Sequence, residues 1–120
     1  MKKQLMVVDD SRVMEMQICK LLEGSEFEVA AYCENGEEAI IRYGELRPDV
    51  VTMDIIMPGI DGLETAQIIL EEYPEAKIIV VSSLNDGDSL HEAEAIGAKT
   101  FLYKPVEREE LLHALETAMA

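Results

Sequence analysis

The sequence predicts a doubly wound α/β fold, in which a five-stranded parallel sheet is covered by five helices in a three-layer sandwich. Three observations lead to this prediction. Short apolar runs alternate with segments of helical periodicity along the chain. Most of these runs are unbroken by polar residues, which is typical of strands buried on both faces of a parallel sheet. Glycine and proline residues stand at the joints between the segments.

The apolar runs that predict buried strands are residues 5–8, 50–53, 78–81 and 101–103. A fifth segment, residues 28–33, is weaker and alternates only partly between apolar and polar side chains. Such a pattern suits a strand at the edge of the sheet. We therefore expect five strands.

Apolar residues at helical spacing predict a helix after each of these strands. The stripes are Met14, Ile18, Leu21 and Leu22; Ala39, Ile40 and Tyr43; Ala66, Ile69 and Leu70; Leu90, Ala93 and Ile96; and Leu111, Leu112, Leu115 and Met119. Right-handed helical crossovers between parallel strands place helices on both faces of the sheet. For the strand order we borrow 2-1-3-4-5 from flavodoxin-like folds, which puts the strand at 28–33 on an edge.

The length and the composition indicate one domain over residues 1–120. The chain has 120 residues, a typical size for one domain, and 48% of them are hydrophobic, which is enough for one core. We find no internal repeat, no low-complexity stretch and no linker to a second domain.

The balance of charges excludes several classes of partner. Acidic residues outnumber basic ones by 25 to 10, and the formal net charge is −15 at pH 7. Nucleic acid would be repelled, because binding it needs basic side chains that displace counterions. The same sign of charge disfavours an anionic membrane surface. We therefore expect no nucleic acid and no membrane insertion.

The lack of a secretory signal predicts a cytoplasmic protein, and the two cysteines are interpreted accordingly. The first apolar run, residues 5–8, is too short for a signal peptide or a membrane span. Without a secretory signal, we interpret Cys19 and Cys33 as lone buried thiols rather than as a disulfide or a metal pair. His91 and His113 lie in predicted helices without ligand-like spacing, and we expect both at the surface.

Polar side chains stand at the ends of four predicted strands. Asp9 and Asp10 follow the first strand, and Asp54 follows the third. Ser82 ends the fourth strand, and Lys104 follows the fifth. In an open parallel sheet, ligands bind beyond the carboxyl ends of the strands, at the point where the strand order reverses. We therefore expect these five side chains at one rim.

This set of side chains favours phosphoryl chemistry with a divalent cation. Three carboxylates repel one another unless a cation neutralises them, and hard oxygen ligands suit Mg²⁺. A lysine beside them makes sense as a partner for an incoming anion, to which Ser82 can also donate a hydrogen bond. One free carboxylate could attack and form an aspartyl-phosphate. Phosphoryl transfer needs mainly positioning and charge neutralisation.

Each of these residues also has a simpler interpretation. Asp9 could cap the first helix, and Asp54 could begin a turn. Ser82 alone could be a polar strand terminus, and Lys104 alone could be a solvated charge. Their coincidence at successive strand ends favours the site.

Four motifs contain these residues: VVDDS at 7–11, MDIIMPGIDG at 53–62, VVSS at 80–83 and FLYKP at 101–105. Together they resemble the receiver domains of two-component response regulators, most closely the single-domain chemotaxis (CheY-like) type. The resemblance extends from Lys3 to about Met119. It implies a CheY-like fold and a switch that a histidine kinase phosphorylates and a downstream protein target recognises.

The resemblance also implies roles around the carboxylates. Asp54 is similar to the phosphoacceptor, and Lys104 to the lysine that pairs with the phosphoryl group. Asp10 is similar to the direct Mg²⁺ ligand, and Asp9 to the ligand that acts mainly through water. The backbone carbonyl of Ile56 would complete the coordination.

Further from the carboxylates, the resemblance implies a switch. Ser82 is similar to the switch hydroxyl, and Phe101 to the aromatic side chain that moves with it. The face formed by the fourth helix, fifth strand and fifth helix would then change its affinity for a partner. The family also suggests a cis peptide at Lys104–Pro105. Because Ile56 and Leu84 are apolar at positions that flank the attacking water, we predict slow self-dephosphorylation.

Five alternatives stay open at this point. A phosphohydrolase with an aspartate nucleophile would need an acid–base carboxylate where Ile56 stands. A flavin-binding module would need a phosphate-binding loop in place of Asp9 and Asp10. A receiver that works without phosphorylation would not need the complete set of site residues. The chain could also be a phosphorelay intermediate or a receiver fragment of a larger regulator. We expect a monomeric switch and no enzyme with a metabolite substrate.

Overall fold

A computed structural model of the chain describes residues 2–83 and 87–120. Over these residues, strands and helices alternate in a regular β–α order. The strands are β1 (Lys3–Val8), β2 (Phe27–Cys33), β3 (Val50–Asp54), β4 (Ile78–Ser82) and β5 (Thr100–Tyr103). The helices are α1 (Arg12–Leu21), α2 (Gly36–Leu46), α3 (Gly62–Glu72), α4 (Gly87–Ile96) and α5 (Arg108–Met119).

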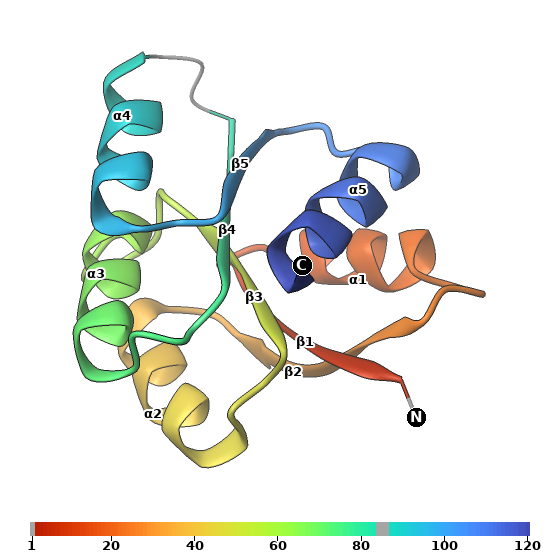
Figure 1. Ribbon diagram of the computed structural model, residues 1–120, viewed down its shortest axis with the longest axis horizontal. Coiled ribbons are helices and arrows are strands. Elements are labelled where there is room, and N and C mark those ends of the chain that lie inside the picture. Colours follow the sequence, from red (N-terminus) through yellow and green to blue (C-terminus); the bar gives the residue numbers. More distant parts are fainter. Residues whose placement is uncertain (1, 84–86) are drawn as a thin grey trace.

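The sheet confirms the predicted topology. Its strand order is β2-β1-β3-β4-β5, and every neighbouring pair is parallel. Figure 1 shows α1 and α5 against one face of the sheet and α2, α3 and α4 against the other. After β1 the chain goes outward to β2 and then returns to add β3 on the other side. The strand order therefore reverses between β1 and β3, where such sheets bind ligands.

Two cores fill the space between the layers, because successive side chains of a strand point to opposite faces. Val7 and Val50 pack with Ile18 of α1 and Leu115 of α5 on one face. On the other face, the core includes Met6, Met53, Ala66 and Ile69. All the residues of β3 and β4 are buried, which explains why their apolar runs in the sequence are unbroken.

The helices bury the stripes that their periodicity predicted. The buried residues include Met14 and Ile18 of α1, Ala93 of α4, and Leu111 and Leu115 of α5. None of the helices in the described part of the chain combines the length and apolar character that a membrane span requires.

Two expectations about burial are wrong. The apolar run of β5 forms the second edge strand, where no residue is fully buried and Tyr103 is 41% exposed. An edge strand has a neighbouring strand on one side only, and the apolar side chains of β5 pack against α4 on one face and α5 on the other. Cys19 lies on the outer side of α1 and is exposed, whereas Cys33 is buried and both thiols are free. His91 and His113 are exposed, as predicted.

Candidate functional site

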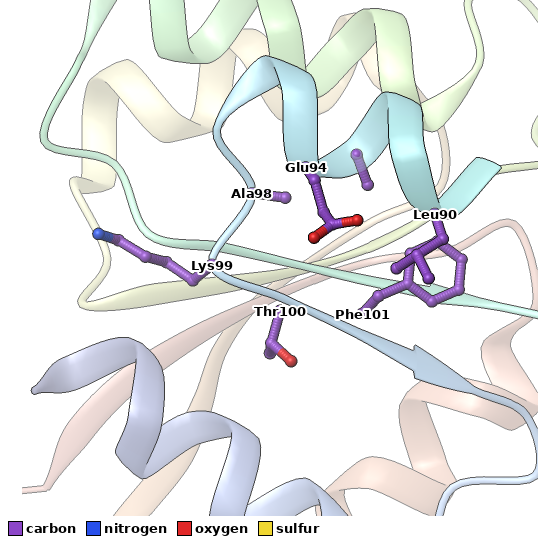
Figure 2. A pocket seen from close by; sticks show the side chains of 7 residues that line it. Leu90, Glu94, Ala98, Lys99, Thr100 and Phe101 are labelled. Carbon is purple, nitrogen blue, oxygen red and sulfur yellow. The ribbon is translucent and has the colours of Figure 1, made fainter. Parts of the chain in front are cut away.

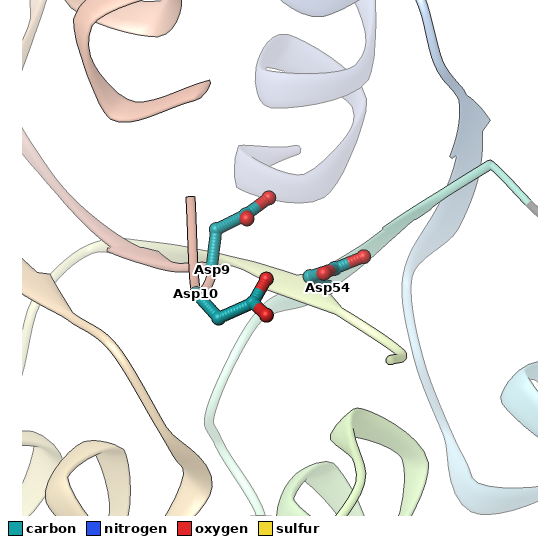
Figure 3. Close-up of side chains that lie close together, drawn as sticks. All are labelled: Asp9, Asp10 and Asp54. Carbon is teal, nitrogen blue, oxygen red and sulfur yellow. The ribbon is translucent and has the colours of Figure 1, made fainter. Parts of the chain in front are cut away.

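The three predicted carboxylates meet beyond the carboxyl ends of β1 and β3 (Figure 3). Asp9 and Asp10 follow β1, and Asp54 is the last residue of β3. One carboxylate oxygen from each lies within 4.8 Å of the others. Asp9 and Asp54 are only 2% and 7% exposed, whereas Asp10 is exposed to solvent. We call this group the carboxylate site.

Lys104 reaches into the carboxylate site from the end of β5. Its Nζ lies 2.9 Å from Oδ2 of Asp9 and 3.4 Å from Oδ1 of Asp54. The backbone N–H of Lys104 donates to the carbonyl of Ser82 at 2.8 Å, which continues the β4–β5 pairing by one residue. The next peptide bond, Lys104–Pro105, is cis, as the resemblance implied. The lysine is therefore anchored beside the site.

Asp9 has both of its carboxylate oxygens engaged. Oδ1 accepts a hydrogen bond of 2.8 Å from the backbone N–H of Ser11, and Oδ2 is paired with Lys104. The bond to Ser11 organises the turn that leads into α1, where the Ser11 side chain makes no capping hydrogen bond. Asp9 therefore does not cap α1, whose N-cap is Ser11, but it holds the turn before the helix and also lies in the carboxylate site.

Burial and charge set the protonation of the site. Burial raises the pKa of Asp54 from 3.8 to about 6, and the negative charge of Asp9 adds to this effect while Lys104 opposes it. Burial alone would lower the pKa of Lys104, but its hydrogen bond to Asp9 and the charge of Asp54 outweigh burial and raise it. The site therefore favours an added positive charge, with Lys104 remaining an ammonium.

The donor set fits a hard divalent cation. Three carboxylates beside one ammonium leave an excess of negative charge when all are ionised, and oxygen ligands are those that Mg²⁺ prefers. The exposed carboxylate of Asp10 gives solvent ions access to the site. Among the described residues, this is the one group of acidic, histidine or cysteine side chains that could hold a metal. Ile56 lies two residues beyond Asp54, and its side chain is 57% exposed.

The first residue of α3, Gly62, has a role that sequence reasoning missed. The backbone N–H of Gly62 donates to the carbonyl of Ile55 at 2.8 Å, and a Cβ at Gly62 would overlap the backbone carbonyl of Asp54. Asp61 caps α3 by accepting from the N–H of Glu64 at 2.8 Å. Gly62 therefore allows α3 to begin directly against the backbone of Asp54. The signal in the sequence was a glycine that follows a capping residue.

The remaining predicted residues lie on β4 and β5. Ser82 is the last residue of β4 and is 1% exposed. Phe101 lines a groove of about 420 Å³ between α4 and β5, with Leu90 and Ala93 on the α4 side (Figure 2). We call this hollow the α4–β5 groove. Leu84, the second apolar position in the dephosphorylation argument, lies outside the described residues.

Comparison with known proteins adds independent information. The chain matches the family model of the response regulator receiver domain over residues 5–116. It is 42% identical to the chemotaxis protein CheY of Listeria monocytogenes over 115 residues, which cover 96% of this chain and 97% of the relative. It is 39% identical to the chemotaxis protein CheY of Thermotoga maritima, over 96% of each chain.

Solved structures agree with these relatives. A chain in the crystal structure of the CheX–CheY–BeF3–Mg²⁺ complex from Borrelia burgdorferi superposes with a TM-score of 0.93 at 30% identity, covering 98% of this chain and 90% of that one. The response regulator domain of Thermotoga maritima CheB gives a TM-score of 0.91 at 33% identity, covering 99% of this chain and 97% of that one. Fold and sequence thus point to the same family.

Proposed function

The chain belongs to the family of response regulator receiver domains, and on this premise we propose that Asp54 accepts the phosphoryl group that activates it. As a member of this family, it is a phosphorylation-activated switch of a two-component system, of the chemotaxis type that its relatives represent. One observation supports the choice of Asp54 above all. Its buried carboxylate lies at the end of the central strand β3, beside both Lys104 and the other two carboxylates.

Asp54 is the proposed nucleophile. An oxygen of its carboxylate attacks the phosphorus of a phosphohistidine on the kinase, a P–O bond forms as the P–N bond breaks, and the imidazole nitrogen keeps the electron pair. The attack requires the ionised carboxylate, and Lys104 favours that form. Because Lys104 Nζ is 3.4 Å from the attacking group, it is placed to pair with an oxygen of the transferred phosphoryl group.

Magnesium fits this site as the cofactor. Asp9, Asp10, Asp54 and the backbone carbonyl of Ile56 are the groups that would hold it, with Asp9 acting mainly through water because its oxygens are already engaged. When bound, Mg²⁺ neutralises charge on the carboxylates and on the phosphoryl oxygens. The chain itself turns over no metabolite in this scheme; it changes its own covalent state.

The proposed output passes through β4 and β5. Ser82 would donate a hydrogen bond to the phosphoryl group, and Phe101 would respond next to the α4–β5 groove. We assign the face formed by α4, β5 and α5 to a downstream protein target, and a histidine kinase to the donor role. The Borrelia burgdorferi complex supports protein partners for such a chain, because it contains CheX together with CheY.

Intact-mass spectrometry tests the assignment. The protein is incubated with acetyl phosphate, with and without Mg²⁺, beside Asp54→Asn and the matched control Asp88→Asn, whose carboxylate is exposed on the first turn of α4. We expect one Mg²⁺-dependent phosphoryl adduct on the wild type and on Asp88→Asn, and none on Asp54→Asn. An equal adduct on Asp54→Asn would refute the assignment.

A further inference from the structure

We propose that Tyr103 is a positioning residue that holds Phe101 in its unphosphorylated arrangement and couples it to Ser82. This inference rests on the proposed function, because it concerns how the phosphorylation site communicates with the α4–β5 groove. It assigns a role to a side chain that neither the motif analysis nor the carboxylate chemistry required.

The pairing of β4 with β5 places these residues together. Val80 is the register partner of Phe101, and Ser82 is the register partner of Tyr103. Register partners in a parallel pair, and residues two apart in a strand, carry their side chains on the same face. All four side chains therefore lie on one face of the sheet, and Tyr103 stands beside Ser82 on β4 and Phe101 on β5.

Packing identifies this face as the one covered by α4. Phe101 packs against the cluster that contains Val80 and Ala93. The alternate residues of the same strand serve the opposite face, where Leu102 packs on the core under α5 and Lys104 reaches the carboxylates. Tyr103 thus lies on the same side of the sheet as Phe101, while its neighbour in the chain, Lys104, reaches the phosphorylation site.

The two aromatic rings are in contact. Their centroids lie 5.0 Å apart at an interplanar angle of 52°, within the range of favourable tilted pairs. Phe101 also borders the open α4–β5 groove (Figure 2), so its ring meets both this groove and the ring of Tyr103. Tyr103 is 41% exposed, so the ring contact lies at the edge of the sheet and not in a close-packed core. Such a pair can be broken without unfolding the domain.

The backbone links this contact to the site. Lys104 N donates to the carbonyl of Ser82 at 2.8 Å, directly after Tyr103, and Lys104 Nζ contacts both Asp9 and Asp54. When Ser82 and Lys104 turn toward a phosphoryl group on Asp54, the strand segment that carries Tyr103 moves with them. The ring of Tyr103 then leaves Phe101, which is free to change position.

Fluorine NMR can follow this step directly. The chain has two phenylalanines, and incorporation of 4-fluorophenylalanine gives one signal for Phe101 and one for Phe27. Phe27 is 1% exposed in the core and serves as an internal reference. BeF3⁻ with Mg²⁺ is the probe for the phosphorylated state. The variants are Tyr103→Leu, which removes the ring, and Tyr103→Phe, which keeps it without the hydroxyl.

We expect the Phe101 signal of Tyr103→Leu to lie nearer its BeF3⁻-bound position even without the probe. The BeF3⁻ concentration at half-saturation should fall about two- to tenfold, since a favourable aromatic contact is lost from the resting state only. Tyr103→Phe should behave as the wild type, and the Phe27 signal should not move. Tyr103→Thr, which also suits a strand, repeats the test if the leucine variant does not fold.

An unchanged Phe101 signal and half-saturation point in Tyr103→Leu would overturn the proposal, as would a higher half-saturation point. If the wild type itself gives no response to BeF3⁻ and Mg²⁺, the proposed function fails instead. The comparison of Tyr103→Leu with Tyr103→Phe in the metal-free protein still decides whether Tyr103 positions Phe101.

Discussion

Replacing Asp54 by asparagine should make the metal-free protein more stable at neutral pH. In the folded chain, burial raises the pKa of Asp54 from 3.8 to about 6, so the folded state binds a proton that the unfolded state has lost. Well below pH 3.8 the carboxyl of Asp54 is protonated in both states and does not reduce the unfolding free energy. As the pH rises toward 6, the unfolded state ionises first and stability falls. Above that range the penalty is constant.

The size of the penalty follows from the same pKa. A difference of about 2 pH units, at about 1.4 kcal/mol each, corresponds to about 3 kcal/mol of unfolding free energy. Asparagine has nearly the shape of the protonated acid and cannot ionise, so Asp54→Asn should recover this amount at pH 8. For a domain of this size, the gain is roughly 10 °C in melting temperature.

Urea unfolding followed by circular dichroism is the assay, because the chain has no tryptophan. Wild type and variant are compared from pH 4.5 to pH 8 in EDTA, and their difference removes the titration of all other carboxylates. We expect the variant's advantage to grow between pH 4.5 and 6.5 and then to level off. The control Asp88→Asn, whose carboxylate is exposed, should show only a small difference.

With added Mg²⁺, the wild type should become more stable than Asp54→Asn. Binding to the folded wild type stabilises it by mass action, whereas the variant has lost one of its ligands. The reasoning would be refuted if Asp54→Asn were no more stable than the wild type at pH 8, or if its advantage were the same at every pH.

Four further substitutions test other parts of the account. Lys104→Met should destabilise the metal-free protein by about 2 kcal/mol at pH 8 and by less at pH 5, because the buried carboxylates lose their counter-charge. Urea titrations measure this loss, and an equal loss at both pH values would contradict the prediction. Gly62→Ala should cost at least about 2 kcal/mol and abolish the phosphoryl adduct, since its Cβ would overlap the backbone of Asp54. Gly87→Ala should be neutral in both assays, because a Cβ there would meet no packed neighbour within 4 Å in the described part of the chain. Thr52→Val should be neutral or stabilising by up to about 1 kcal/mol, because the buried Thr52 hydroxyl has no hydrogen-bond partner among the described residues; a clear loss on thermal unfolding would show that the hydroxyl is satisfied. Ile56→Asn should shorten the lifetime of the phosphorylated state, because the exposed apolar side chain is replaced by one that can orient water, and a mass-spectrometric decay that is faster in the wild type would count against this.

The central strands could be predicted from the sequence because strands buried on both faces consist almost entirely of apolar residues. Every residue of β3 and β4 is buried, so each appears as an unbroken apolar run. β5 shows the same kind of run for another reason: it lies at an edge, and helices from both faces cover it only in part. A short apolar run therefore predicts a strand better than it predicts the strand's place in the sheet.

The residues of the carboxylate site could be predicted from the sequence, but the differences between their environments could not. Parallel strands bring Asp9, Asp10 and Asp54 to one rim whatever their roles are, and only the family resemblance chose among them. The structure distinguishes them physically, since Asp10 is exposed, Asp9 has both oxygens engaged, and Asp54 is buried with a raised pKa. Such differences depend on tertiary contacts, above all on the reach of Lys104 from the opposite edge of the sheet.

Close tertiary contacts were even harder to predict from the sequence. Gly62 is required by one close backbone approach, and Tyr103 gains Ser82 as a neighbour only through the register of β4 and β5. Similarly, Cys19 is exposed although its residue type is usually buried, because it follows the buried Ile18 on the outer side of α1.

Locating the phosphoryl group on the chain tests the central claim most directly. Borohydride reduction converts an acyl phosphate of aspartate into homoserine, which fragment-ion sequencing then places in the chain. After treatment with acetyl phosphate and Mg²⁺, we expect homoserine at position 54 and unchanged aspartate at positions 9 and 10. Homoserine at position 9 or 10, or a phosphoryl adduct that leaves Asp54 intact, would contradict the account.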